Sequence, residues 1–388
     1  MKILILSSRY PPDIGTAGFR AKIYADALLK YGDEKLNIDV LIPSDIAQAI
    51  ETNSRLTVLR IKTPPNKRSF LYRLYIFFYF AINALITVRS KQYDMIIVTS
   101  GRLGSAVLGA VIADIKSAIL YLDLRESAPD NIKDIFKGWQ GSLLRKIFSS
   151  LEGWAVHKAK TINLISPAFL AEYQNNYPNC TFTCYTHAVN PLFMNLNMPA
   201  YDQIMPKRLK IYYAGTIGYA QQLHLILPEL AQRTAHTLDF YVIGNGNNVA
   251  LLRNALIKNK IHNVTLLPEI PRAELIPHYQ NADILFLHIY PYPFTAKVLP
   301  SKLFEYAAIG KPIWAGIMGF AQQFVEKEIS NCAIFKPGDV DDALLALSKL
   351  SLKSIPRTEF NEKFNQESLM KNLAHEILSL DYAENKSS

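Results

Sequence analysis

The sequence predicts an α/β protein of two domains, each with a parallel sheet covered by helices. The chain has 388 residues, which suits two domains better than one. Short apolar runs rich in β-branched residues alternate with helical patterns in two successive series, as is typical of β-α-β units. Apolar residues make up 49% and charged residues 19%, so disordered and low-complexity classes are excluded.

The first series of predicted elements occupies the N-terminal half of the chain. We expect strands at residues 2–7, 38–42, 56–61, 95–99, 118–122 and 161–165, and helices that include 19–31 and 103–116. The segment 190–199 is rich in Pro and Asn and has little periodicity, which is typical of a linker. We therefore place the first domain at residues 1–195.

The second series follows that linker and repeats the same alternation. We expect strands at 209–213, 238–243, 264–267, 284–288, 312–315 and 333–335, with helices between them. A helical pattern after the last of these units extends over 364–380. The second domain is therefore predicted at residues 196–363.

The cysteines and the N-terminus favour a cytoplasmic location. Cys180, Cys184 and Cys332 are an odd number without the spacing of a disulfide framework or a zinc site. The apolar run after the initial Met-Lys is too short for a signal peptide and resembles a first strand. His157, His224 and His288 have no partners at ligand spacing, so no metal site is predicted.

The net charge of +9 is concentrated in one segment. No acidic residue occurs between Glu51 and Asp94, and the basic residues in that window are Arg55, Arg60, Lys62, Lys67, Arg68, Arg73, Arg89 and Lys91. The stretch 70–86 inside it is apolar and aromatic, and a helix of this kind suits an anionic membrane surface. We expect peripheral contact through residues 67–91, because the apolar run 74–82 is shorter than the ~20 residues that span a bilayer. The alternative is a buried core helix with solvated basic ends, and nucleic acid is not an expected partner because no reading motif occurs.

Glycine turns follow several of the predicted strands, where ligands collect in open α/β sheets. The first strand leads into a Pro-stiffened turn with Gly15 and Gly18, which ends at Arg20. In the second domain, one strand runs into Gly215, Thr216, Ile217 and Gly218, and the next into Gly244, Asn245 and Gly246. Backbone without a Cβ approaches a phosphate closely, so these turns suggest a pyrophosphate-bearing ligand between the domains, with plain turn chemistry as the alternative. No Rossmann G-x-G-x-x-G or P-loop spacing is present.

The segment from Lys297 to Pro312 is the most specific part of the sequence. Leu299, Pro300 and Ser301 lead into a predicted helix that Ser301 is able to cap, and Lys302 and Glu305 lie one turn apart on it. One ionised Glu can accept hydrogen bonds from two ribose hydroxyls, while a lysine and the helix N-terminus offset diphosphate charge. A surface Lys–Glu pair on an amphipathic helix is the alternative.

These motifs occur together in an order that resembles the family 4 glycosyltransferases. The matching motifs are Tyr10-Pro11-Pro12-Asp13 with Gly15 and Gly18, Gly215-Thr216-Ile217-Gly218, Ile243-Gly244-Asn245-Gly246, and Pro300-Ser301-Lys302-Leu303-Phe304-Glu305-Tyr306 with Gly310-Lys311-Pro312. Within the family, the chain is similar to bacterial enzymes that build O-antigen, capsule or exopolysaccharide units, including N-acetylfucosamine transferases. The Gly218-Tyr219-Ala220-Gln221-Gln222-Leu223 stretch supports this narrower similarity.

The resemblance implies a GT-B fold, with two Rossmann-like domains facing a central cleft and a C-terminal helix, 364–383, that packs back onto the first domain. It implies a retaining transfer from a UDP- or GDP-sugar to a glycan or polyprenyl-diphosphate-linked acceptor, without a metal or other cofactor. By the same resemblance Glu305 binds the ribose, the turn at Gly215 approaches the diphosphate, and Glu269 and Ile270 lie beside the base. The loop from Gly15 to Gly18 closes over the phosphates and the transferred sugar.

Two departures from the family pattern concern charge. The first carboxylate of the usual Glu-x7-Glu pair would fall eight residues before Glu305, where Lys297 stands, and the usual Arg and Lys after the Gly215 turn are replaced by Tyr219, Gln221 and Gln222. We expect Lys297 or Lys302 to neutralise the leaving diphosphate instead.

In the first domain, Asp123 and Arg125 follow a predicted strand at the position of the family's active-site loop. We expect Asp123 to orient or deprotonate an acceptor hydroxyl and Arg125 to hold a phosphate; a structural Asp–Arg pair is the alternative. Two other functions stay open. A sugar-nucleotide epimerase would need clustered acid–base residues, which occur only as scattered candidates, and Lys297 also fits a catalytically degenerate protein that binds a nucleotide or a partner.

Overall fold

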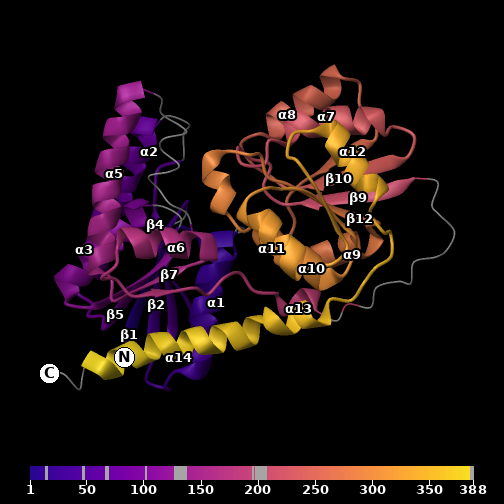
Figure 1. Cartoon of the computed structure of the whole chain (residues 1–388). Helices are drawn as coiled ribbons and strands as arrows, with labels where there is room; N and C mark the ends of the chain where they lie inside the picture. Colours follow the sequence, from indigo (N-terminus) through magenta and orange to yellow (C-terminus); the bar gives the residue numbers. More distant parts are fainter. Residues whose placement is uncertain are drawn as a thin grey trace. The chain divides into compact units, whose positions relative to one another are not determined.

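The computed structural model describes residues 1–13, 16–45, 49–65, 70–100, 103–125, 138–194, 196 and 208–384. The chain divides into two compact units (Figure 1). Unit 1 consists of Met1–Thr186 and Glu367–Ser388, and unit 2 of His187–Gln366. Residues 187–194, placed in the first domain on the sequence, thus belong to unit 2, because Val189 and Phe193 are fully buried in its core.

Unit 1 contains an eight-stranded sheet in the order β3-β4-β2-β1-β5-β6-β7-β8. The strands are β1 (Lys2–Ser7), β2 (Asn37–Ser44), β3 (Ala49–Asn53), β4 (Leu56–Lys62), β5 (Met95–Ser100), β6 (Ile119–Leu124), β7 (Thr161–Leu164) and β8 (Phe182–Thr183). The central strands are continuous apolar runs because helices cover both faces of the sheet. All pairs are parallel except β3 with β4, which are joined by a two-residue connection at the sheet edge.

The helices of unit 1 are α1 (Thr16–Tyr31), α2 (Phe70–Val88), α3 (Leu103–Lys116), α5 (Gly138–Lys158), α6 (Pro167–Asn176) and the C-terminal α14 (Gln366–Glu384). Figure 1 shows α14, in yellow, beside α1. Met370, Leu373 and Ile377 of α14 join Tyr24 and Leu28 of α1 in one buried cluster against the sheet. The C-terminal helix is therefore part of the core of unit 1.

Unit 2 contains a parallel six-stranded sheet in the order β11-β10-β9-β12-β13-β14. The strands are β9 (Leu209–Ala214), β10 (Leu238–Ile243), β11 (Val264–Leu267), β12 (Ile284–His288), β13 (Ile313–Gly316) and β14 (Cys332–Phe335). The α-helices are α7 (Leu223–Arg233), α8 (Val249–Lys258), α9 (Leu275–Asn281), α10 (Ser301–Ile309), α11 (Phe320–Glu328), α12 (Val340–Ser348) and α13 (Thr358–Lys363). Short 3₁₀ turns are η1 (Pro191–Phe193), η2 (Arg272–Glu274) and η3 (Pro293–Lys297).

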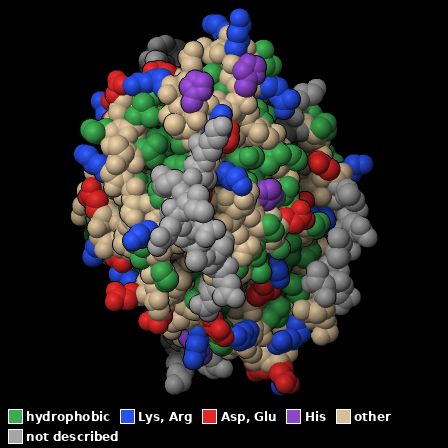
Figure 2. Space-filling view, turned by 90° about the vertical axis from the view of Figure 1, so that its right-hand side faces the viewer, with side chains coloured by type: hydrophobic (Ala, Val, Ile, Leu, Met, Phe, Trp, Pro, Cys, Tyr) green, Lys and Arg blue, Asp and Glu red, His purple; other side chains and the backbone are tan. Residues whose placement is uncertain are grey.

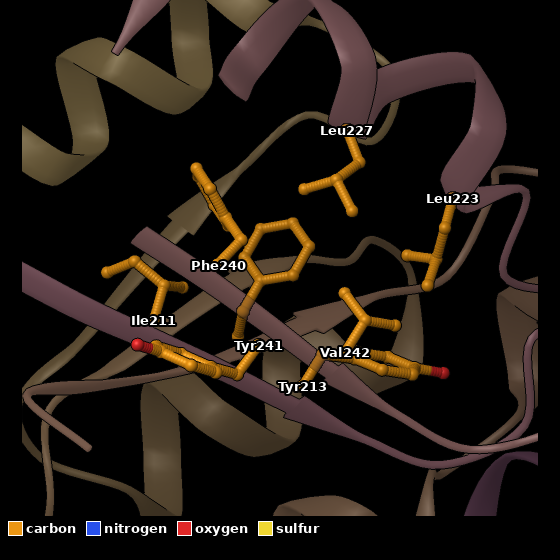
Figure 3. A pocket seen from close by; sticks show the side chains of 8 residues that line it. Ile211, Tyr213, Leu223, Leu227, Phe240, Tyr241 and Val242 are labelled. Atoms are coloured by element: carbon orange, nitrogen blue, oxygen red, sulfur yellow. The ribbon is translucent and has the colours of Figure 1, made fainter. Parts of the chain in front are cut away.

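Two buried apolar clusters make up the core of unit 2. A narrow gap in one of them lies between α7 and the sheet, lined by residues such as Leu223, Leu227 and Phe240 (Figure 3). It has no room for a water molecule. We therefore regard it as core packing and not as a binding site.

Each strand expected from the sequence is present, with its ends shifted by two residues at most. The edge strand β3 was not expected, because it is short and gains its partner only in the folded sheet. Helix α1 begins at Thr16, earlier than residue 19, so Gly18 lies in its first turn and not in the preceding loop. Helix α14 confirms the expected C-terminal helix.

Candidate functional site

The strand order of unit 2 reverses its direction between β9 and β12, which are neighbours in the sheet. In open α/β sheets, ligands bind beyond the carboxyl ends of the strands at such a switch point. The loop after β9 covers residues 215–222, and the loop after β12 covers 289–300. Both loops contain residues that the sequence singled out for donor binding.

The loops that follow β9 and β10 are tightly packed against each other. The amide of Gly215 donates to the carbonyl of Ile243, and the amide of Ile217 to that of Asn245, both at 2.8 Å. A Cβ on Gly244 would lie 1.8 Å from the carbonyl oxygen of Gly215, and one on Gly246 would lie 2.3 Å from that of Ile217. Close packing of the two loops therefore explains why glycines stand at 244 and 246. The expected contact of Gly244 with the donor stays a prediction.

Gly215 serves a different purpose, because it makes room for Lys302. A Cβ on Gly215 would lie 2.7 Å from Cε of Lys302, so the lysine stem passes directly over the glycine. Lys302 Nζ lies 3.3 Å from Oε2 of Glu305, one turn further along α10. The expected Lys302–Glu305 pair is thus confirmed. It brings together the glycine turn expected at a diphosphate and the carboxylate expected at a ribose.

Glu305 is a buried, ionised carboxylate with an unsatisfied oxygen. It is 3% exposed, and its Oε1 lies 2.7 Å from the Arg272 guanidinium. Burial raises the pKa of Glu305, but the charges of Lys302 and Arg272 outweigh burial and lower it. Oε1 nevertheless accepts no hydrogen bond of good geometry. A buried acceptor of this kind suits a hydroxyl donor from a ligand.

Arg272 is a site residue that the sequence did not reveal. It lies on η2, and through Glu305 it ties the segment after β11, which includes Glu269 and Ile270, to helix α10. Glu269 is exposed, and Ile270 packs partly buried against the core. The contact of Arg272 with Glu305 therefore holds the segment expected beside the base, which includes Glu269 and Ile270, close to the carboxylate expected beside the ribose. Nothing in the local sequence distinguishes Arg272 from a surface arginine.

The start of α10 corrects one expectation. Pro300 occupies the N-cap position, and Ser301 is the first helical residue, so Ser301 does not cap the helix. No side chain accepts a hydrogen bond from the first turn, which leaves that turn suited to an anion. The side chain of Leu299 is buried in the core, so any contact it makes with a donor would involve its main chain. Lys297 lies on η3 and is half-buried.

Three aromatic rings lie together on the two loops of the switch point. Tyr219 follows β9, whereas Tyr292 and Phe294 follow β12. The ring centroids of Tyr219 and Tyr292 are 4.5 Å apart and the planes differ by 11°. Tyr219 is 46% exposed, in the same loop as Thr216 and Gly218. The sequence did not predict this cluster, because its members are separated by some seventy residues and meet only through the pairing of β9 with β12.

In unit 1, Asp123 lies within β6 and is completely buried. Arg20 donates to both of its oxygens, at 2.7 and 2.8 Å, and Thr99 and Asn163 donate at 2.9 and 2.7 Å. Burial alone would raise the pKa of Asp123, but Arg20 and Asn163 lower it to about 2. The ion-pair partner of Asp123 is Arg20, and the charge of Arg125 also lowers the pKa of Asp123. A catalytic role for Asp123 stays a prediction.

The structure describes three further unit 1 residues that the sequence singled out: Arg20, Gly18 and Arg125. Arg20, expected to bind the donor, is buried against Asp123. Gly18 packs in the first turn of α1 against the main chain of Tyr10 and Asp13. Arg125 is half-buried directly after β6. Gly15 lies outside the described residues.

Helices α2 and α5 of unit 1 expose an apolar surface. Large side chains recur at helical spacing on α2, where Leu71, Tyr75, Phe78, Ile82 and Ile86 are each more than half exposed. A second row on α5 consists of Leu143, Ile147, Leu151 and Trp154. Both helices contact α3. By length and composition, the segment Leu71–Val88 is long and apolar enough to cross a membrane, and only 17% of it is buried. The expected peripheral contact with a membrane stays a prediction.

Comparisons with known proteins give a family match for part of the chain and show the fold. Residues 200–367 match the family model described as Glycosyl transferases group 1. A search of curated proteins finds no match. Sucrose-phosphate synthase from Thermosynechococcus elongatus is structurally similar, with a TM-score of 0.78 at 15% identity over 98% of this chain and 99% of that one.

Two further solved structures are similar over most of their lengths. HepE from Anabaena in complex with UDP-glucose has a TM-score of 0.64 at 15% identity, over 98% of this chain and 99% of that one. WaaG, a glycosyltransferase involved in lipopolysaccharide biosynthesis, has a TM-score of 0.62 at 12% identity, over 96% and 95%. The two Rossmann-like units and these similarities show a GT-B fold.

Proposed function

We propose that this GT-B chain, whose second unit matches the Glycosyl transferases group 1 model, is a glycosyltransferase that uses a nucleotide-diphosphate sugar. Two observations support a UDP- or GDP-sugar as the donor: the site in unit 2, and the UDP-glucose bound by the similar HepE. A retaining, metal-independent transfer to a glycan or polyprenyl-diphosphate-linked acceptor follows from the family resemblance. We place the reaction in bacterial surface polysaccharide synthesis on the same ground.

The contact of Lys302 with both Gly215 and Glu305 carries this proposal. The turn after β9 has no Cβ at Gly215, α10 starts without a side-chain cap, and Lys302, which passes over Gly215, adds a cation. Ionised Glu305 with its unsatisfied oxygen supplies the acceptor for a ribose diol. Together these groups provide what a nucleoside diphosphate requires.

The chemistry assigned to these residues is positioning and charge stabilisation. Breaking the bond to the transferred sugar leaves a nucleoside diphosphate whose charge grows in the transition state. Lys302 and the first amides of α10 would stabilise that charge without a metal ion. Among the described residues, no group of three His, Cys, Asp or Glu side chains is placed to hold a metal. Lys297, on the loop after β12, is the second cation we assign to this task.

We further propose that unit 1 contacts the inner face of an anionic membrane through α2 and α5. Arg73 and Arg89 flank the exposed face of α2, Arg145 and Lys146 lie on α5, and all four are exposed. The described side chains of these helices include one acid, Glu152, which is buried beside Tyr173. The inner side of α2 packs on unit 1 through Phe80, Ala84 and Val88, which favours a helix lying on the surface. On the face of the protein shown in Figure 2, by contrast, basic and acidic side chains are interspersed.

The first test is a thermal-shift screen against UDP, GDP, dTDP, CMP and ADP, with the Glu305→Gln variant alongside. A ligand at 100 times its dissociation constant stabilises a protein by about 2.7 kcal/mol. We expect one nucleotide to shift the melting temperature of the wild type and to lose most of that effect in Glu305→Gln. Release of that nucleotide from its sugar conjugate, dependent on a lipid-linked acceptor, then separates a transferase from a degenerate binder. Interconversion of the free nucleotide sugar without acceptor would instead indicate an epimerase.

A further inference from the structure

We propose that Tyr219, Tyr292 and Phe294 form a platform that binds a pyranose ring through its apolar C–H face. This inference rests on the proposed function, because it names the part of the site beyond the nucleotide. The rings come from the two loops that flank the switch point between β9 and β12. We call these three residues the aromatic platform.

The rings of the aromatic platform are nearly parallel. The centroids of Tyr292 and Phe294 are 5.5 Å apart with a plane angle of 9°, and those of Tyr219 and Phe294 are 6.4 Å apart with a plane angle of 10°. Tyr219 leaves nearly half of its surface exposed. Since Tyr219 stacks on Tyr292, the ring face of Tyr219 turned away from Tyr292 is the apolar face left for a ring-shaped ligand.

Hydrogen bonds hold the platform in place without any ligand. Gln222 donates to the hydroxyl of Tyr292 at 2.5 Å, and the amide of Tyr290 donates to the carbonyl of Ala220 at 2.8 Å. Thr295 Oγ1 lies 2.7 Å from the carbonyl of Tyr292. The two loops are thus fastened to each other, and little ordering is left to occur on binding.

The chemistry of both loops suits a neutral, hydroxyl-rich ligand. Residues 215–222 and 289–296 contain no charged side chain, and the first charged residue after them is Lys297; Thr216 and Gln221 carry hydroxyl and amide groups. A phosphate would need cations here, whereas a sugar ring needs an apolar face and scattered polar partners.

The position of the platform also favours a sugar. A chain of contacts leads from the loop after β11 to the turn at Gly215: Arg272 contacts Glu305, Glu305 contacts Lys302, and Lys302 passes over Gly215. Tyr219 lies four residues after Gly215 in the same loop. A donor with its ribose at Glu305 and its diphosphate at Lys302 would therefore place its sugar toward the platform. The ring bound there is either the transferred sugar of the donor or the terminal sugar of the acceptor.

The experiment compares Tyr219→Ala with Tyr219→Phe, which keeps the ring, and with Leu225→Ala, which removes another exposed apolar side chain of unit 2. Calorimetry gives the dissociation constants of the nucleoside diphosphate selected by thermal shift and of its glucose and N-acetylglucosamine conjugates. Initial rates give the KM of the acceptor. Far-UV spectra and melting temperatures verify folding.

If the donor sugar lies on the platform, Tyr219→Ala weakens a nucleotide sugar about tenfold and the nucleoside diphosphate less than twofold. If the acceptor lies there, donor affinity is unchanged and the acceptor KM rises about tenfold. In both cases Tyr219→Phe and Leu225→Ala retain wild-type values. Two outcomes for Tyr219→Ala would overturn the aromatic platform but leave the proposed function standing. One is an equal loss of affinity for the nucleoside diphosphate and the nucleotide sugar. The other is no change in either donor affinity or acceptor KM. Failure of the wild type to bind any nucleotide would overturn the proposed function itself.

Discussion

Arg20 and Asp123 form a two-point ion pair in the interior of unit 1, with nitrogen–oxygen distances of 2.7 and 2.8 Å. The same guanidinium donates to the main-chain carbonyls of Tyr185 and Thr186, at 2.9 and 3.3 Å. Thr186 is the last residue of unit 1 before the chain enters unit 2. The pair therefore fixes the start of α1 and the point where the chain leaves unit 1.

Replacing Asp123 by Asn should destabilise unit 1 by about 3 to 5 kcal/mol, because it leaves the buried Arg20 charge without its partner. Urea denaturation monitored by circular dichroism gives the change in the free energy of unfolding. The double variant Arg20→Met with Asp123→Leu removes both charges and should be less destabilised than Asp123→Asn. A fully stable Asp123→Asn that has lost only turnover would instead support the catalytic role expected from the sequence.

The stability of unit 2 should fall as the pH drops from about 6.5 to about 4, because of His288. Burial lowers the pKa of His288 to about 4, and the hydrogen bond of its ring to the carbonyl of Gln221 raises the pKa only in part. Since Gly338 N–H donates to Nε2, the proton of the neutral ring resides on Nδ1. Neutral His288 makes its full contribution to the free energy of unfolding above pH 6.5. Below that pH the contribution is lost, because the histidine becomes protonated in the unfolded state but stays neutral in the folded state down to about pH 4. The difference is on the order of 3 kcal/mol.

The measurement for His288 is the free energy of unfolding between pH 7.5 and 4.5, for the wild type and for His288→Gln. We expect the variant to be less stable at pH 7.5 and to show a weaker dependence on pH in this window. Parallel curves for the two proteins would assign the pH dependence to other groups.

Substitution of Lys302 should slow turnover more than it weakens donor binding. Lys302→Met removes the cation that lies over Gly215, and we expect kcat to fall by two to three orders of magnitude, as for the loss of one transition-state charge stabiliser. Lys297→Met is the matched variant on the neighbouring loop. A steady-state assay of nucleotide release measures both. Near-wild-type kcat in both variants would contradict the assignment of diphosphate neutralisation to these lysines.

Charge reversal on α2 and α5 should release the protein from anionic vesicles. The variant Arg73→Glu, Arg145→Glu, Lys146→Glu loses about 1 kcal/mol of attraction per removed cation, and the introduced acids add repulsion. Co-sedimentation with vesicles containing phosphatidylglycerol measures the bound fraction. The charge-matched control Arg253→Glu, Lys258→Glu, Lys327→Glu alters exposed positions of unit 2 and should bind as the wild type does.

Unchanged vesicle binding of the α2 and α5 variant would refute the electrostatic account. A concentration-dependent change of mass in solution without lipid, measured by light scattering, would assign the apolar surface to a second copy of the chain.

The central strands and the α10 pair could be predicted because their signals are local. The run after Lys2 reads as a buried strand by itself, and the three-residue spacing of Lys302 and Glu305 guarantees their proximity on a helix. Arg272 and the aromatic platform could not be predicted, since their partners are brought close by the order of strands in the sheet.

Charge counting was similarly incomplete as a guide to the surface. Several of the basic residues between Glu51 and Asp94 have partners inside unit 1, and Arg60 and Lys91 are examples. Arg60 donates to the carbonyl of Pro11 and contacts Asp13, and Lys91 pairs with the buried Asp39. A count of charges cannot separate such internal pairs from cations that face solvent.

The packing of the loops after β9 and β10 determines how a mutational scan of this chain should be interpreted. Any side chain at Gly244 or Gly246 collides with rigid backbone, so both positions will be intolerant whatever ligand the protein binds. A loss of function on substitution of Gly244 or Gly246 therefore reports on the packing of the loops and not on ligand binding. A methyl group at Gly215 comes closest to the flexible end of Lys302, 2.7 Å from Cε, so a variant that folds normally has its ammonium group displaced. An activity defect of Gly215→Ala in a normally folded protein would thus be an electrostatic signal, and Gly215 is the glycine whose substitution reports on the donor.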